Sequence, residues 1–84
     1  MSYELDVALD ARAVGRGLEF EAQEAVLDEL DRIAAQPFSL PRGAVVRDVV
    51  VEIAGVRHYV FIQLSVSHPR RAVNVYRLGH FASS

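Results

Sequence analysis

The first residues of the chain alternate between apolar and acidic side chains, which is the pattern of an extended segment. The apolar members of this alternation are Tyr3, Leu5, Val7 and Leu9. Because a period of two places them on one face, residues 3–10 are predicted to form a strand that is buried on one side. Asp10 is suited to cap a short helical turn over residues 11–14, and Gly15 and Gly17 interrupt the chain after it.

A helical period replaces the alternation from Leu18 onwards. Residues 18–35 are predicted to form the main helix, because apolar side chains recur at heptad-like steps and acidic side chains occupy much of the remaining surface. Pro37 ends this helix, since proline restricts the residue before it to extended conformations. The apolar stripe comprises Phe20, Gln23, Leu27, Leu30 and Ala34, with Val26 and Ile33 beside it.

The second half of the chain is rich in Val and Ile and returns to a period of two. It predicts strands over residues 44–54, 56–66 and 72–80, joined by turns at Gly55 and at residues 67–71. The order β-α-β-β-β predicts an α+β fold, a small antiparallel four-stranded sheet with the helix packed on one face and the other face open. The residues predicted to form the core are Leu27, Leu30, Val49, Val51, Val60, Ile62 and Val75.

The length and composition are those of one small domain. A chain of 84 residues has no room for a second core, so residues 1–84 are predicted to form a single domain. A hydrophobic share of 51% excludes intrinsic disorder. No apolar run approaches the ~18 residues of a membrane span. The N-terminus shows no secretory signal and cysteine is absent, which favours a cytoplasmic protein without a membrane partner.

Charge is distributed unevenly along the chain. Residues 1–36 hold three arginines and nine acidic residues, whereas residues 37–84 hold six arginines and two acidic residues. All nine basic residues are arginine, which removes any lysine nucleophile or lysine phosphate anchor. This asymmetry favours a polyanion or an acidic protein as the partner of the second half. The alternative is that the acids lie on a solvated helix face and the arginines on an exposed sheet.

The open face of the predicted sheet carries the candidate chemistry. Its members on one strand, which recur at every second position and so point the same way, are Arg57, Tyr59, Phe61 and Gln63. Arg77 and His80 lie near the end of the last strand. Arginine neutralises phosphates, tyrosine or phenylalanine stacks bases, and histidine acts as a general acid or base near neutral pH. These residue types together indicate RNA binding and RNA cleavage.

A structural role accounts for some of the same residues. Tyr59 and Phe61 are also explained by burial under a loop or at a dimer interface, and Arg57 by an ion pair with Glu52 across the hairpin. His58 falls on the apolar side of its strand and is predicted to be buried and hydrogen-bonded. The three histidines lack metal-ligand spacing and no cofactor motif is present, so neither a metal nor a cofactor is predicted.

Four stretches occur in an order and spacing typical of one family. They are the strand that leads into helix at residues 3–9, the leucine-containing helix that ends in proline at residues 26–37, the Gly-Val-Arg-His-Tyr-Val-Phe strand from Gly55, and the closing strand with Leu-Gly-His-Phe up to Phe81. Together they resemble the RelE/ParE superfamily of toxins from toxin–antitoxin systems, over nearly the whole chain.

The resemblance implies a compact α/β toxin that is neutralised by a cognate antitoxin, which wraps it with a helix or a strand. Some members cleave mRNA on the ribosome and others poison DNA gyrase. For a metal-independent endoribonuclease, the resemblance implies that Arg57 and Arg77 bind the scissile phosphate and its neighbours, that His80 is the acid or base, and that Tyr59 or Phe61 stacks a base. An acidic or amphipathic antitoxin segment is expected to cover the basic sheet face.

The chain departs from the family at several positions. It has no lysine on the strand before Gly55, Phe81 follows Gly-His where the family has arginine, and the first helix of the family's hairpin is reduced to residues 11–14. These departures favour a second hypothesis, a catalytically degenerate member that acts only by binding protein. It would be a gyrase-type inhibitor or a sheet-mediated interaction module, with a homodimer as one form. The sequence does not distinguish between mRNA on the ribosome, DNA gyrase and neither of these as the target.

Overall fold

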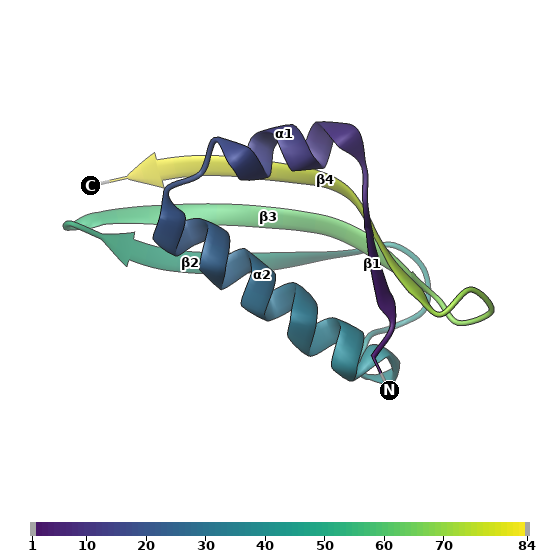
Figure 1. Ribbon diagram of the computed structural model, residues 1–84. Helices are drawn as coiled ribbons and strands as arrows, with labels where there is room; N and C mark the ends of the chain where they lie inside the picture. Colours follow the sequence, from purple (N-terminus) through teal and green to yellow (C-terminus); the bar gives the residue numbers. More distant parts are fainter. Residues whose placement is uncertain (1, 84) are drawn as a thin grey trace.

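The computed structural model describes residues 2–83 and contains a single four-stranded sheet with two helices on one of its faces (Figure 1). The strands are β1 (Glu4–Val7), β2 (Val45–Ile53), β3 (Val56–Ser67) and β4 (Ala72–Ser83). The helices are α1 (Leu9–Arg16) and α2 (Phe20–Ala35), and a 3₁₀ turn, η1 (Pro37–Ser39), follows α2. The opposite face of the sheet carries no helix among the described residues (Figure 1). The predicted α+β architecture is therefore confirmed.

The sheet is mixed, in the order β1-β4-β3-β2. β2, β3 and β4 form two successive antiparallel hairpins, as predicted. The prediction of a wholly antiparallel sheet was wrong for β1, which pairs parallel with β4 and places Leu5 beside Val73 and Val7 beside Val75. A tight turn forces its two strands to be antiparallel, but β1 is joined to the rest of the sheet through two helices, and such a crossover permits parallel pairing.

The segment after β1 forms a complete helix. The strand ends at Val7 instead of Asp10, and α1 extends over eight residues where the sequence predicted only a turn over residues 11–14. Leu9, which was assigned to the buried face of the strand, is 79% exposed, whereas Ala11 is fully buried. α1 lies along β4 (Figure 1). The small side chain of Ala11 therefore sits where the helix meets the sheet, and packing there outweighs the apparent alternation.

Helix α2 buries four residues of the predicted stripe, as expected, but leaves one edge of that stripe exposed. Leu27 and Phe20, both assigned to the apolar stripe, are 54% and 66% exposed. The centre of the observed stripe lies roughly 90° around the helix from Leu27, at 3.6 residues per turn. The assignment of Leu27 to the core was therefore wrong. The side chains that α2 does bury are Ala22, Val26, Leu30, Ile33 and Ala34.

The remaining predicted core residues lie between the helices and the sheet. Leu30, Val60, Ile62 and Val75 are buried, with exposures between 0% and 4%. The β2 residues of the predicted core, Val49 and Val51, are only partly buried but pack against the same cluster. The position of β2 at the edge of the sheet explains this, since it has a neighbouring strand on one side only.

A β-bulge in β4 decides which side chains share a face of the sheet. Leu64 of β3 pairs with Val75, but Gln63 pairs with Arg77, so Tyr76 is the extra residue in β4. Before the bulge, odd-numbered residues such as Val75 point towards the helices. After it, even-numbered residues do, because one inserted residue inverts the alternation.

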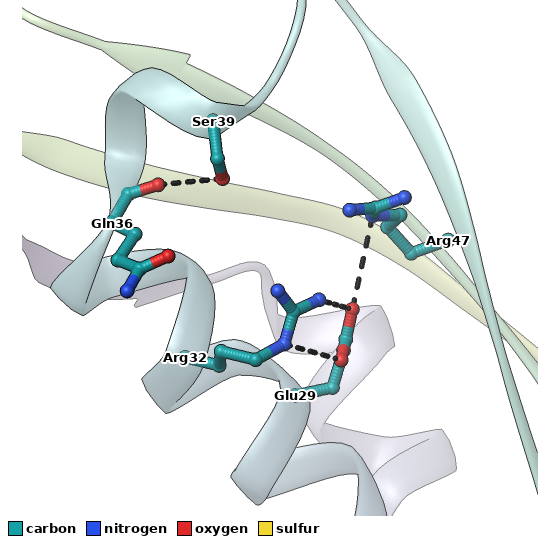
Figure 2. A network of polar contacts seen from close by, with 5 residues as sticks. All are labelled: Glu29, Arg32, Gln36, Ser39 and Arg47. Carbon is teal, nitrogen blue, oxygen red and sulfur yellow. Dashed lines mark hydrogen bonds and ion pairs between the residues drawn. The ribbon is translucent and has the colours of Figure 1, made fainter.

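Glu29 connects α2 to β2 (Figure 2). The Nε and Nη2 atoms of Arg32 donate hydrogen bonds to Glu29 Oε1 and Oε2, at 3.2 and 2.6 Å, and this hydrogen bonding and charge raise the pKa of Arg32. On β2, Arg47 Nε lies 3.7 Å from Glu29 Oε2 and has no hydrogen-bond partner within the described part of the chain. Arg47 therefore belongs to the helix side of the sheet.

Candidate functional site

Aromatic side chains from β3 and β4 meet on the open face of the sheet. Tyr59 pairs with Phe81 across the two strands, and their rings stack with centroids 4.7 Å apart and an interplanar angle of 17°. The ring of Phe61 lies 5.5 Å from that of Phe81. Phe61 and Phe81 stay 37% and 48% exposed. From the sequence, Phe81 was interpreted only as a departure from the family pattern. In the structure its ring contacts those of both Tyr59 and Phe61.

A hollow lies beside this aromatic cluster. Its volume is about 320 Å³, and the residues lining it are Val46, Phe61, Gln63, Arg77 and Gly79. Gly79 pairs with Phe61, and a Cβ at position 79 would lie 3.6 Å from Phe61 Cδ2, so the glycine leaves this side of the ring open. Arg77 pairs with Gln63 at the rim. A flat apolar group can therefore stack on Phe61 while Arg77 contacts a negative charge attached to it.

The open face is not basic, contrary to the expectation from the charge asymmetry. Arg57 and Arg77 are its arginines on β3 and β4, but β2 contributes Asp48 opposite Phe61 and Glu52 opposite Arg57. These four charges cancel. Within residues 2–83, the ion pairs involve Glu29 with Arg32 and Arg47, so Glu52 and Arg57 are neighbours without a close ion pair. They border a second hollow of about 220 Å³ together with Gly55 and Ser83.

His80 lies on the other face of the sheet. It pairs with Val60, which is buried under the helices, and its Nε2 atom is 3.1 Å from Nδ1 of His58. The two imidazole rings are nearly parallel, with an interplanar angle of 10°. His58 is 9% exposed, so the prediction of a buried, hydrogen-bonded histidine is confirmed, and its partner is the residue proposed as the catalyst.

Three of the four candidate residues lie on the same face of the sheet. Arg57, Tyr59 and Arg77 share the open face, and His80 does not. Arg77 pairs with Gln63, however, six residues along β3 from Arg57, so the two arginines are about 20 Å apart along the strand. The separation of Arg77 from His80 was predictable from the sequence, because residues three positions apart in a strand point to opposite faces. The bulge at Tyr76 then determines that Arg77, and not His80, points to the same face as Arg57.

An apolar groove lies between the two helices. Its volume is about 250 Å³, and it is bordered by β4 as well as by α1 and α2. Arg12 and Arg16 of α1 line it on one side. The groove was not predicted, because Leu27 was assigned to the core instead of to an exposed surface. Its apolar lining includes Leu18, Val26, Leu27, Leu30 and Leu78.

Two further features bear on the kind of site. Across residues 2–83, no group of three or more His, Cys, Asp or Glu side chains is arranged so that it could hold a metal ion. Neither of the two described helices is long and apolar enough to cross a membrane.

Comparison with known proteins identifies solved structures with the same fold. No protein-family model matches the chain, and no curated protein matches it significantly. A mutant of the E. coli toxin RelE in the free state matches with a TM-score of 0.66, at 22% identity over 94% of this chain and 83% of that one. The intact E. coli RelBE toxin–antitoxin complex matches with a TM-score of 0.63, at 20% identity over 93% and 95%. The archaeal RelE–RelB complex from Pyrococcus horikoshii matches with a TM-score of 0.63, at 17% identity over 93% of both chains.

At these identities the similarity is one of fold. The matches extend over at least 93% of this chain, so the similarity concerns nearly the whole fold. The chain therefore has the fold of the RelE toxins, and the resemblance inferred from its motifs is confirmed at that level.

Proposed function

We propose that the chain is the toxin of a toxin–antitoxin pair. The observation that carries the proposal is the RelE fold together with large apolar side chains that the chain leaves uncovered on the helices and on the open face of the sheet. Two of the matching structures are toxin–antitoxin complexes, and a partner chain that covers such surfaces explains their exposure. The most exposed of these apolar side chains on the helices are Leu9, Phe20 and Leu27.

The groove between α1 and α2 is the proposed docking site of the antitoxin. An amphipathic helix fits a groove of this kind by inserting apolar side chains at helical spacing. Leu27, which lines the groove and is 54% exposed, would be covered by such a helix. Arg12 and Arg16 on the α1 side favour acidic residues along the edge of the antitoxin segment.

The open face of the sheet is the proposed surface that acts on the target. It combines the stacked rings of Tyr59 and Phe81, the hollow beside Phe61, and the two arginines Arg57 and Arg77. Aromatic residues and arginine are enriched at protein interfaces, and a face without net positive charge suits a protein better than a polyanion. The toxin would therefore act in the cytoplasm by binding a protein target, for which DNA gyrase is the candidate.

Cleavage of mRNA on the ribosome is the second candidate. Arg57 and Arg77 are suited to contact phosphates, and Phe61 to stack a base. Cleavage also needs a proton acceptor and a proton donor at the same phosphate. Because His80 lies across the sheet from both arginines and is hydrogen-bonded to His58, Tyr59 is the titratable group left on the open face of β3.

Induced expression with growth as the readout tests whether the chain is toxic and which residues its toxicity requires. Wild type is expected to arrest growth, Arg57→Ala and Phe61→Ala to abolish the arrest, and His80→Ala to retain it. Arg12→Ala, on the opposite side of the molecule, is the matched arginine control and should remain toxic without antitoxin. Assays of ribosome-dependent mRNA cleavage and of gyrase supercoiling then identify the target. Ribosome-dependent mRNA cleavage by wild type that is lost, together with toxicity, in a folded Tyr59→Phe or His80→Ala variant would favour the nuclease and overturn the binding mechanism.

A further inference from the structure

A second cluster of aromatic side chains lies at the other end of the sheet from Arg57. Tyr3 precedes β1, Phe38 belongs to η1, and His68 follows β3, so three separate segments contribute one ring each. The rings of Phe38 and His68 stack with centroids 4.4 Å apart and an interplanar angle of 4°. Tyr3 lies edge-on to Phe38 at 6.3 Å, and its hydroxyl is 2.9 Å from His68 Nδ1. We call these three residues the end cluster.

The end cluster is fixed in place but open to solvent. Phe38 is 77% exposed even though His68 stacks on it and Tyr3 meets its edge. Burial of so little of the ring contributes little to the stability of the fold. The hydrogen bond between Tyr3 and His68 nevertheless restrains both neighbours of the ring. Such a preorganised and exposed aromatic ring is suited to stack a flat ligand.

Positive charge surrounds the end cluster. Arg70 and Arg71 are exposed in the same turn as His68. Arg71 is held in a left-handed conformation, with φ of 51°, and its backbone N–H donates to the carbonyl of His68 while its own carbonyl accepts from the N–H of Glu4. Arg42 lies in the loop that enters β2 opposite Leu64, near the same end of β3. Half of the six arginines of the second half are therefore at this end.

A hollow joins the aromatic and the basic side chains. It has a volume of about 320 Å³ and is lined by Ser2, Tyr3, Phe38 and Arg71. Arg57 lies at the far end of β3, 10 residues from Ser67, which corresponds to about 33 Å at 3.3 Å per residue. The molecule is 41 Å long in its longest direction, so the end cluster and Arg57 lie towards opposite ends of it.

We propose that the end cluster binds single-stranded nucleic acid. A base would stack in the hollow against Phe38, and Arg70 and Arg71 would contact the flanking phosphates, which is the combination that single-strand binding proteins use. A folded protein partner would need a larger apolar area than this one exposed ring provides. Arg42, Arg70 and Arg71 outnumber Glu4 and Asp6, the exposed carboxylates of the neighbouring strand β1, so these five charges sum to +1 although the whole chain has a net charge of −2.

Fluorescence anisotropy with a labelled ten-nucleotide single-stranded RNA at low salt tests the site. Phe38→Ala should weaken binding about 5- to 150-fold, the value of one stacked base, whereas Phe38→Trp should retain it. The double variant Arg70→Gln/Arg71→Gln should lower the slope of log affinity against log salt by about 1.4, because each phosphate contact on a single strand contributes about 0.7. Circular dichroism is expected to show each variant folded, since all three side chains are exposed.

Matched controls come from the helical side of the molecule. Phe20→Ala removes an aromatic ring that is 66% exposed, and Arg12→Gln/Arg16→Gln removes two arginines of α1, so neither should change RNA affinity. Equal losses in the controls and in the end-cluster variants would overturn the proposal, as would wild type that does not bind the RNA. Inorganic polyphosphate separates stacking from charge. If Phe38→Ala weakens polyphosphate binding as much as RNA binding, no base is stacked and the proposal fails.

Discussion

Leu30→Ala and Leu27→Ala make the same chemical change three residues apart on α2, and we expect their costs to differ several-fold. Leu30 is 4% exposed and Leu27 is 54% exposed. The substitution removes three carbon atoms, which are worth about 2.4 kcal/mol when they are fully buried. A cavity term brings the usual range to about 2–5 kcal/mol. Because Leu30 borders the groove between the helices, its neighbours can partly collapse, and we expect a loss of about 3 kcal/mol.

The expected cost of Leu27→Ala is below about 1 kcal/mol, since half of this side chain is already in water and its removal creates no enclosed cavity. Urea unfolding of both variants, with a common slope, measures the difference. A difference of about 2 kcal/mol corresponds to roughly 8–16 °C in Tm for a domain of this size. Equal losses would show that α2 is rotated about its axis, and would refute both the observed core and the exposed apolar groove.

Two further predictions concern the hairpin turn and the contact between α2 and β2. Ala54 adopts a φ of 52° and Gly55 a φ of 81°, so Ala54 is strained in a left-handed conformation. Ala54→Asn should raise Tm by several degrees, because Asn tolerates this conformation and Asn-Gly favours the two-residue turn. An unchanged or lower Tm would contradict backbone strain at Ala54. Glu29→Gln removes the acidic partner of Arg32 and Arg47 and should cost up to about 1 kcal/mol at low salt and less at 1 M NaCl. Urea titrations at both salt concentrations measure this, and a loss that is independent of salt would argue against an electrostatic role.

The parts of the fold that follow from local signals were predictable from the sequence. The turn at Gly55 joins two alternating strands through two residues with positive φ, and this joins β2 to β3 with little ambiguity. Pro37 likewise marks the end of α2, which stops at Ala35. The direction of β1 had no such signal, because its partner β4 is more than 60 residues away and the connection passes through both helices.

The candidate site was predictable in part for the same reason. Arg57, Tyr59 and Phe61 share a strand, so the alternation alone placed them on one face. The bulge at Tyr76 has no recognisable sequence signature, yet it sets the face of every later residue of β4. The contact between His58 and His80 and the end cluster depend on the register of strands and loops that are distant in sequence. Such contacts cannot be inferred from the pattern of one strand.

Growth after co-induction of the chain and its antitoxin tests the central claim most directly. The candidate antitoxin is any small protein whose gene adjoins the gene of this chain. Wild type is expected to arrest growth when induced alone and to be neutralised when the antitoxin is induced with it. Leu27→Asp places a charge in the groove between α1 and α2 at a side chain that is 54% exposed, so it should remain folded and toxic but escape neutralisation. Normal growth of cells that express soluble, folded wild type alone would contradict the account.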